Sequence, residues 1–265
     1  MQVTFATVAG DPAIPNEDFV VASPDVVVVV DGVTPLDRSD TGCRHGVAWY
    51  ARTLGTRLFS LAGKGSDPLT DCLAAAIAET RNAHGGGCDP AHPDSPAATV
   101  AVVRLREGTL EHLVLSDAAI VVDTGGEPRL ITDNRAGQVG RRLRADGIRP
   151  TGPVVRARRN QHGGYWVAAE RPESAYEALT GESALSGVRT VVAATDGATR
   201  LVDTFGWGDW RDAVEALRAG GPDAWIAQTR AAERADAGQP AGQRRTTAKV
   251  HDDATLALLR VHGDV

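Results

Sequence analysis

The fold of this chain is decided by residues 26–32, which read VVVVVDG. Five consecutive valines predict a β-strand buried on both faces, because β-branched side chains pack well on a pleated surface. A second apolar run, Phe19–Ala22, precedes it across the turn at residues 23–25, and two strands joined by a short turn predict a hairpin. The valine strand ends on Asp31, a residue type that disfavours strands and is costly to bury unless it is paired or bound to a metal.

Outward from this hairpin, groups of strands alternate with groups of helices. Short apolar runs predict further strands at Val3–Val8, Ala98–Leu105, Leu110–Leu115, Ala119–Asp123, Pro128–Ile131, Thr190–Ala194 and Ala254–Val261. Apolar residues at helical spacing, bounded by Gly and Pro, predict helices over residues 46–61, 68–84, 210–219 and 222–237. The close spacing of the strands between residues 98 and 131 predicts an antiparallel meander. This order favours an α+β fold of stacked layers over a doubly wound parallel sheet.

Length and composition are typical of an ordinary folded domain. The chain has 265 residues, of which 42% are hydrophobic and 23% charged, so a mainly disordered chain is excluded. We expect a single domain over residues 1–265, and a monomer. The net charge of -6 offers no broad basic surface, so no nucleic-acid partner is expected. Neither a leader sequence nor an apolar run of membrane-spanning length is found in the sequence, which predicts a cytoplasmic protein with no membrane partner.

The cysteines and histidines carry little information in the sequence alone. Cys43, Cys72 and Cys88 are too few for a disulfide framework and form no C-x-x-C pair, so a structural zinc site is not expected. We interpret them as small apolar core residues. His45 is a candidate general acid, or a residue that packs at the start of a helix, and His84 is expected to be solvated in a loop.

Acidic residues recur where the predicted strands begin or end. Glu17 and Asp18 precede one strand, Asp31 and Asp196 end two others and are each followed by glycine, Asp117 lies between two strands, and Asp252 and Asp253 precede the last. Taken singly, an Asp-Gly pair is usually a turn. Taken together, these carboxylates would repel one another at one end of a pair of sheets unless hard cations were bound. Oxygen ligands suit Mg²⁺ or Mn²⁺, and two such ions about 3.5–4 Å apart form a site for phosphate-ester hydrolysis.

Six short motifs carry a resemblance to a known family. In chain order they are NED at residues 16–18, VDG at 30–32, AATVA at 97–101, LSD at 115–117, TDG at 195–197 and DDAT at 252–255. With these motifs the chain resembles, over nearly its whole length, the type-2C protein phosphatases, the Mg²⁺/Mn²⁺-dependent serine/threonine phosphatases, and in particular their bacterial members. Each motif alone is weak, but their order and the intervening elements make the set specific.

The resemblance implies both a fold and a set of site residues. The fold is a four-layer α-β-β-α sandwich with two central, mainly antiparallel sheets. The implied metal ligands are Glu17, Asp18, Asp31, the carbonyl of Gly32, Asp117, Asp196 and Asp252, of which Asp31 bridges two ions and Asp117 helps to hold a third, weaker one. Asn16 and Asp253 would support these ligands from behind. A water between the two ions would attack phosphorus, which makes Asp31, Asp196 and Asp252 the expected catalytic residues.

The match breaks where the family binds the substrate phosphate. Ala13 stands where the family often has arginine, and Thr34-Pro35-Leu36 replaces the usual glycines after the Asp-Gly pair. Ser116 and Ala97 each replace a family glycine. The arginine-rich, irregular residues 134–164 are expected to form a flap beside the site. Candidates to replace the lost phosphate contact are Arg38, Arg44, Arg141 and Arg142, since a guanidinium suits phosphate, although such arginines can also simply solvate a loop.

Three hypotheses of function follow. The first is a metal-dependent phosphatase that acts on phosphoserine and phosphothreonine in proteins. The second is the same chemistry on a small phosphorylated metabolite, and the third is a phosphatase-like domain that binds a partner with little turnover. A haloacid-dehalogenase-type phosphatase is excluded because it needs a second aspartate two residues after Asp31, where this chain has Val33.

Overall fold

The computed structural model describes residues 1–246 and 249–261, which form two five-stranded sheets covered by helices. Sheet A has the order β1 (Gln2–Val8), β10 (Ala254–Arg260), β9 (Thr190–Ala194), β6 (Ala119–Asp123), β7 (Arg129–Thr132). Sheet B has the order β2 (Asp18–Ala22), β3 (Val26–Gly32), β4 (Ala98–Arg106), β5 (Thr109–Leu115), β8 (Leu179–Ala184). Neighbouring strands are antiparallel throughout both sheets.

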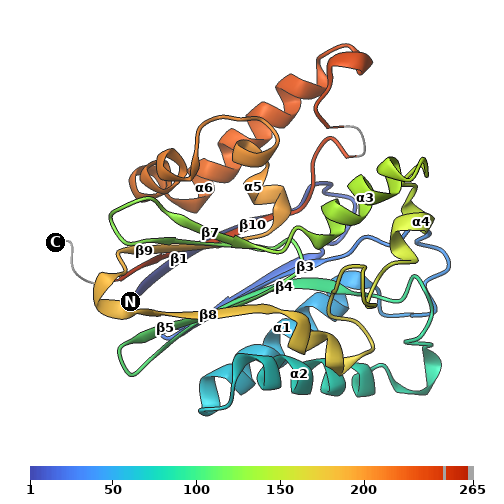
Figure 1. The fold of residues 1–265 in the computed structure, drawn as a ribbon, viewed down its shortest axis with the longest axis horizontal. Helices are drawn as coiled ribbons and strands as arrows, with labels where there is room; N and C mark the ends of the chain where they lie inside the picture. The colour runs from blue at the N-terminus through green and yellow to red at the C-terminus, as the bar shows by residue number, and fades with distance from the viewer. Residues whose placement is uncertain (247–248, 262–265) are drawn as a thin grey trace.

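Helices cover the outer face of each sheet, which confirms the four-layer α-β-β-α architecture (Figure 1). Helices α1 (Val47–Lys64) and α2 (Leu69–Ala83) pack against sheet B, while α5 (Asp196–Asp203) and α6 (Trp210–Ala237) pack against sheet A. The remaining helical segments are α3 (Arg135–Ala145), α4 (Gly152–Arg156) and the 3₁₀ turns η1 (Gly85–Gly87), η2 (Pro172–Glu177), η3 (Leu185–Gly187) and η4 (Ala241–Gln243). None of the helices in the described ranges is long and apolar enough to cross a membrane.

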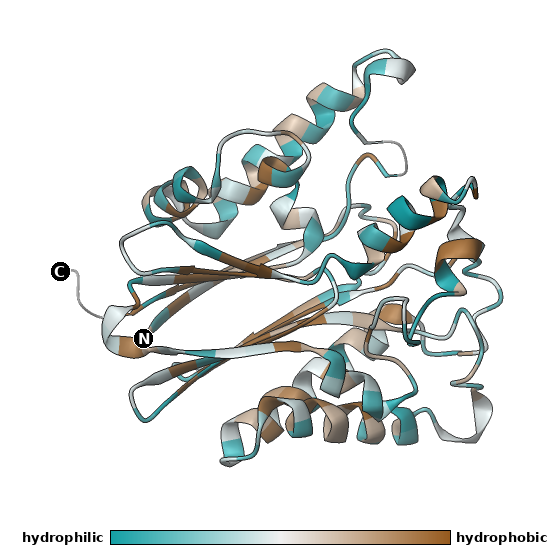
Figure 2. Cartoon of the chain, viewed as in Figure 1, coloured by the Kyte–Doolittle hydropathy of each residue, from teal (hydrophilic) through white to brown (hydrophobic). Residues whose placement is uncertain are grey.

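The valine strand lies at the centre of the packing. Val27 and Val29 point into the core between the two sheets, and Val26, Val28 and Val30 point into the core between sheet B and the α1–α2 pair. All five are at most 3% exposed, so the prediction of a strand buried on both faces is confirmed. Burying one such side chain contributes roughly 1.5–3 kcal/mol. Figure 2 shows the hydrophobic colouring concentrated along the strands and on the helix faces that meet them.

The structure corrects the predicted meander. The chain forms the β4–β5 hairpin in sheet B and then crosses to sheet A, where β6 pairs with β7 and β9. Ser116 makes the crossing possible because its φ of 68° turns the chain sharply between β5 and β6. Close spacing along the sequence shows that strands are short, but it does not show which sheet they join.

Four further elements, α3, α4, β8 and α5, were missing from the sequence prediction. Residues 134–164 are less irregular than expected, since they contain α3 and α4. Strand β8 at the edge of sheet B and helix α5 after β9 were not predicted. By contrast, the predicted break between helices 210–219 and 222–237 is confirmed within α6, where Gly221 has a φ of 78° and precedes Pro222.

Candidate active site

The register of the β2–β3 hairpin places two carboxyl groups side by side. Asp18 at the start of β2 pairs with Asp31 near the end of β3, and Asp31 pairs in turn with Thr99 of β4. Asp18 is only 8% exposed; its Oδ2 accepts a hydrogen bond from Thr195 Oγ1 at 2.8 Å, whereas its Oδ1 is buried without a hydrogen-bond partner. Like charges directly opposite each other destabilise a sheet, so this pair needs a compensating cation or proton.

Sheet A brings two more carboxyl groups to the same end of the sandwich. Asp196 begins α5 directly after β9, and Asp252 lies just before β10. The two segments are held together because Thr195 N–H donates to the carbonyl of Thr255 at 2.9 Å. A Cβ on Gly197 would lie 1.9 Å from the carbonyl oxygen of Asp253, so only glycine permits this approach. The glycine of the TDG motif therefore has a packing reason.

Burial, together with repulsion between neighbours, raises the pKa values of three of these carboxyl groups. The pKa of Asp31 is raised well above its ordinary value, first by burial and then by the charges of Asp18, Asp196, Asp117 and Asp252. Burial raises the pKa of Asp18 to about 8, although its hydrogen bond with Thr195 works in the opposite direction. Burial, with repulsion from Asp117 and Asp252, raises the pKa of Asp196 to about 6. Several buried carboxyls that resist ionisation together are typical of a site that receives positive charge.

Asp117 reaches this cluster from the crossing between the two sheets. It follows Ser116, whose Oγ donates to Asp117 Oδ1 at 3.3 Å. Asp117 is exposed, yet neighbouring protein withholds enough solvent from its carboxyl group to raise the pKa, and Asp133 adds repulsion. Its position at the rim differs from that of Asp18, which is buried.

Backbone loops around the cluster are held by Asn16 and Asp253. The Oδ1 atom of Asn16 accepts a hydrogen bond from the backbone N–H of Asp18 at 3.0 Å. The carboxylate of Asp253 accepts from the N–H groups of Gly10 at 2.7 Å and of Glu17 at 2.6 Å. Both side chains thus fix the backbone beside the acidic residues, which is a positioning role.

Three cations contact the acidic residues, and two of them were not anticipated. Arg38 forms a two-point ion pair with Glu17, with N–O distances of 2.8 and 2.9 Å. Lys249 and Arg200 each contact Asp252 at 2.7 Å. Arg200 lies four residues after Asp196 on α5, and because α5 was not predicted, nothing in the sequence analysis placed it here. Lys249 precedes Asp252 by three residues, a spacing that carries no clear sequence pattern.

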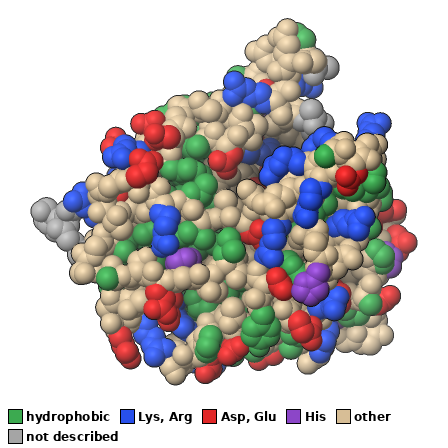
Figure 3. Space-filling model, viewed as in Figure 1, with side chains coloured by type: hydrophobic (Ala, Val, Ile, Leu, Met, Phe, Trp, Pro, Cys, Tyr) green, Lys and Arg blue, Asp and Glu red, His purple; other side chains and the backbone are tan. Residues whose placement is uncertain are grey.

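A cavity of about 430 Å³ opens beside the carboxylates and is lined by Glu17, Thr34, Arg38, Lys249, His251, Asp252 and neighbouring residues. Of the four candidate arginines, Arg38 lines this cavity. Arg142 lines a separate cavity of about 160 Å³ on α3, Arg141 lies along Gly137 of the same helix, and the guanidinium of Arg44 lies against Gly87. Figure 3 shows Lys and Arg side chains gathered over the part of this face where Figure 1 labels α3 and α4.

The acidic cluster fits a centre for hard divalent cations. Its donors are all oxygens, and one of them, Asp18 Oδ1, is buried without a partner. At Gly32 a Cβ would lie 2.3 Å from Val47 Cγ1 and 2.7 Å from the carbonyl of Glu17. Because glycine has no side chain, the backbone of Gly32 packs closely against these two residues. The raised pKa values of Asp18, Asp31 and Asp196 are the expected state of such ligands without their cations.

A second cluster forms where α1 begins and α2 ends. It consists of Cys43, His45, His84 and Cys88, whose ligand atoms all lie within 4.8 Å of one another. His84 is 2% exposed, so the prediction that it is solvated was wrong. Cys72 is a buried core residue as predicted, whereas Cys43 and Cys88 are half-buried beside the two imidazoles.

These features define a class of protein: an α-β-β-α sandwich with a carboxylate centre at one end of its two sheets. The sequence model of the family described as protein phosphatase 2C matches residues 13–229. The chain belongs to this family. No curated protein matches it by sequence.

Solved structures agree in fold. The PPM Ser-Thr phosphatase MsPP from Mycobacterium smegmatis, in complex with cacodylate, is 15% identical with a TM-score of 0.59 over 98% of both chains. The catalytic domain of the serine threonine protein phosphatase PstP, in complex with two manganese ions, is 14% identical with a TM-score of 0.59 over 97% of this chain and 96% of its own. PppA of Pseudomonas aeruginosa is 16% identical with a TM-score of 0.61 over 98% and 96%. At these identities the likeness shows the fold.

Proposed function

We propose that this chain is a metal-dependent phosphatase that hydrolyses phosphoserine and phosphothreonine esters on proteins. The observation that carries the proposal is the convergence of Asp18, Asp31, Asp196 and Asp252 from both sheets, where burial and the neighbouring charges raise the pKa values of Asp18, Asp31 and Asp196. Membership of the protein phosphatase 2C family, and the similarity in fold to the Ser/Thr phosphatases MsPP and PstP, support the choice of reaction and substrate.

In this proposal Mg²⁺ or Mn²⁺ is the cofactor, with two ions and a third held more weakly. Asp31, Asp196 and Asp252 are the central ligands, joined by Glu17, Asp18 and the carbonyl of Gly32, and Asp117 holds the third ion. When bound, the ions supply the Lewis acidity that phosphate-ester hydrolysis needs. The chain's own part is to hold the carboxylates close together, and Asn16 and Asp253 do so through the backbone hydrogen bonds described above.

Arg38 and Lys249 are the proposed contacts for the substrate phosphate. Both line the 430 Å³ cavity, and each is 41–45% exposed at its side chain while it touches an acidic residue of the site. A guanidinium and an ammonium on one cavity wall attract an anionic phosphoryl group and orient it by charge-assisted hydrogen bonds. They would compensate for Ala13, where the family often carries arginine.

The arginine-rich residues 134–164 remain the proposed flap. Arg156 at the end of α4 donates to the carbonyl of Thr34 at 3.0 Å and pairs with Asp94. Thr34 Oγ1 in turn donates to Glu17 at 3.0 Å. The flap is therefore linked to the acidic site through one intervening residue. A single domain over residues 1–265, a monomeric state and a cytoplasmic location remain predictions.

The test is hydrolysis of a phosphothreonine peptide and of p-nitrophenyl phosphate, each with Mn²⁺, with Mg²⁺ and with EDTA. We expect turnover that requires the metal and is lost in Asp31→Asn. Asp25→Asn is the matched control, since Asp25 is exposed at the opposite end of the same hairpin, and it should keep full activity. Turnover that persists in EDTA or in Asp31→Asn would refute the proposal. A strong preference for small phosphate esters would favour a metabolite substrate instead.

A further inference from the structure

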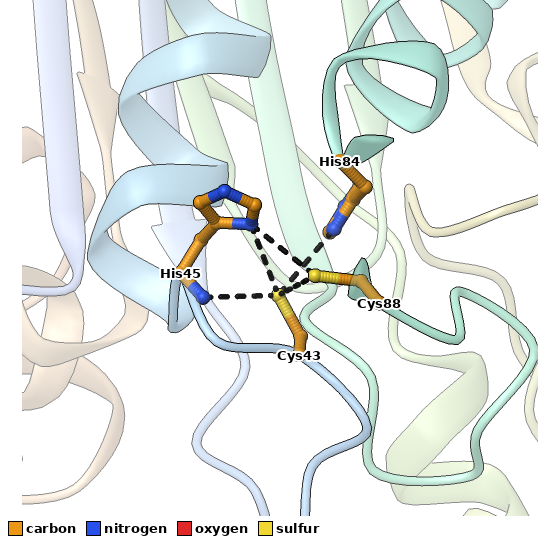
Figure 4. Close-up of side chains that lie close together, drawn as sticks. All are labelled: Cys43, His45, His84 and Cys88. Carbon is orange, nitrogen blue, oxygen red and sulfur yellow. Dashed lines mark hydrogen bonds between the residues drawn. The ribbon is translucent and has the colours of Figure 1, made fainter. Parts of the chain in front are cut away.

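Two cysteines and two histidines meet at the junction of α1 and α2 (Figure 4). Cys43 and His45 lie just before α1, His84 follows the last residue of α2, and Cys88 follows the 3₁₀ turn η1. In Figure 4 the two sulfurs and one nitrogen of each imidazole point toward a common centre. Side chains from two segments about forty residues apart thus form one compact set.

Four of the six distances between the ligand atoms match the edges of a tetrahedral metal site, and the other two are at most 4.8 Å. The two sulfurs are 3.7 Å apart; His45 Nδ1 lies 3.7 Å from Cys43 Sγ and 3.4 Å from Cys88 Sγ, and His84 Nδ1 lies 3.4 Å from Cys43 Sγ. A tetrahedron with zinc–sulfur bonds of about 2.3 Å and zinc–nitrogen bonds of about 2.0–2.1 Å has S–S edges of about 3.8 Å and S–N edges of about 3.5 Å. The four measured edges deviate from these values by roughly 0.2 Å or less.

The surroundings hold the ligands in these positions. The ring of Trp49 stacks on His45 with centroids 4.2 Å apart and meets His84 edge-on at 4.9 Å. The backbone N–H of His45 donates to Cys43 Sγ at 3.3 Å. The imidazoles are thus fixed by aromatic packing, and one sulfur is fixed by the backbone.

We propose that Cys43, His45, His84 and Cys88 bind one structural zinc ion. Four protein ligands of the Cys₂His₂ type fill a tetrahedral site and leave no open position, which is typical of structural rather than catalytic zinc. A disulfide between Cys43 and Cys88 is the alternative for this pair. It would need the sulfurs to move from 3.7 Å to about 2.05 Å apart and would leave two imidazoles directed at no ligand.

The proposed zinc ion would cross-link two segments that are far apart in the sequence. It would tie the start of α1 to the end of α2, the helix pair that covers sheet B. It would also fix the far end of residues 33–46, the segment that begins after Gly32 and carries Thr34 and Arg38 to Glu17. Loss of zinc should therefore lower stability and loosen this wall of the active site.

The test measures metal directly. The protein is produced without a metal-binding tag and dialysed against metal-free buffer. Its zinc content is then measured by inductively coupled plasma mass spectrometry. We expect one zinc ion per chain, and the same amount in the Asp31→Asn/Asp196→Asn double variant, which separates this site from the carboxylate centre. Replacement by Co²⁺ should give intense thiolate-to-cobalt absorption in the near ultraviolet, which carboxylates cannot produce.

Variants assign the ion to these residues. Cys43→Ser, Cys88→Ser and His84→Ala should each lose zinc and the cobalt band, and should melt at lower temperature. Cys72→Ser and His162→Ala are the matched controls and should keep the bound zinc and the cobalt band, since Cys72 lies in the core and His162 in an exposed loop. The proposal is overturned if the wild-type protein holds no zinc and gives no thiolate-to-cobalt band. It is also overturned if Cys43 and Cys88 are found joined by a disulfide.

Discussion

Replacing Asp18 by asparagine should stabilise the protein when metal ions are removed. The carboxyl group of Asp18 is buried, directly faces Asp31, and has one oxygen without a hydrogen-bond partner. Its pKa is raised from 3.8 to about 8, mainly by burial. Between these two values the folded state keeps a proton that the unfolded state has lost, so the stability of the metal-free wild type falls as the pH rises through this window.

The expected size follows from the same two values. The difference between 3.8 and about 8 corresponds to at most about 6 kcal/mol if Asp18 titrated alone. Asp18, Asp31 and Asp196 titrate together, and the neighbours can take up part of the proton, so we expect a gain of about 1–3 kcal/mol for Asp18→Asn near pH 8. An asparagine oxygen can still accept the hydrogen bond from Thr195. The melting temperature should rise by about 2–4 °C for each kcal/mol in a chain of this size.

The assay is thermal unfolding in EDTA at about pH 4 and about pH 8, where the two forms of the group are separated most clearly. Asp18→Asn should exceed the wild type near pH 8, and the difference should shrink toward pH 4. Asp25→Asn, exposed on the same hairpin, should follow the wild type at both values. The reasoning is refuted if Asp18→Asn is no more stable than the wild type near pH 8, or if its advantage is the same at both pH values.

Three other substitutions test separate parts of the site. Gly197→Ala would place a Cβ 1.9 Å from the carbonyl oxygen of Asp253, so we expect a loss of about 3 kcal/mol or more in a melting curve, together with loss of phosphatase activity. Lys249→Met removes a partly exposed cation that contacts Asp252, and steady-state kinetics should show KM for a phosphopeptide rising roughly three- to tenfold with kcat little changed, equal to about 1 kcal/mol. Ser116→Gly relieves a left-handed backbone, and urea unfolding should show a gain of up to about 1 kcal/mol; a lower midpoint would mean that the Ser116 side chain outweighs the strain.

The parts of the fold that depend on local pattern were predicted from the sequence. In the valine strand, the covering helices and the last strand, the spacing of the apolar residues along the sequence shows which faces are buried. Strand β8 was missed because it lies at a sheet edge and alternates exposed with half-buried residues, without apolar side chains on one face. Helix α5 was missed because its eight residues follow a strand directly, and so short a segment gives little periodicity.

The carboxylates of the site could be named from the sequence because each one interrupts a strand end, where a charge is out of place. The cations around them could not, since Arg200 and Lys249 reach Asp252 only through the three-dimensional path of the chain. The same limit applies to the cysteines and histidines. The absence of a C-x-x-C pair argued against zinc, but Cys43 and Cys88 approach each other only because α1 and α2 fold back as a helical hairpin.

The division of the acidic residues between the two sheets has a consequence for folding. Asp18 and Asp31 belong to sheet B, whereas Asp196 and Asp252 flank strands of sheet A. Neither layer alone carries the full set, and the set is complete only once the two sheets have closed over their shared core. The binding free energy of a ligand that contacts residues of both sheets therefore adds to the stability of the packed pair of sheets. Such a ligand binds the folded arrangement and not the unfolded chain, so it should raise the melting temperature of the whole sandwich rather than that of one sheet.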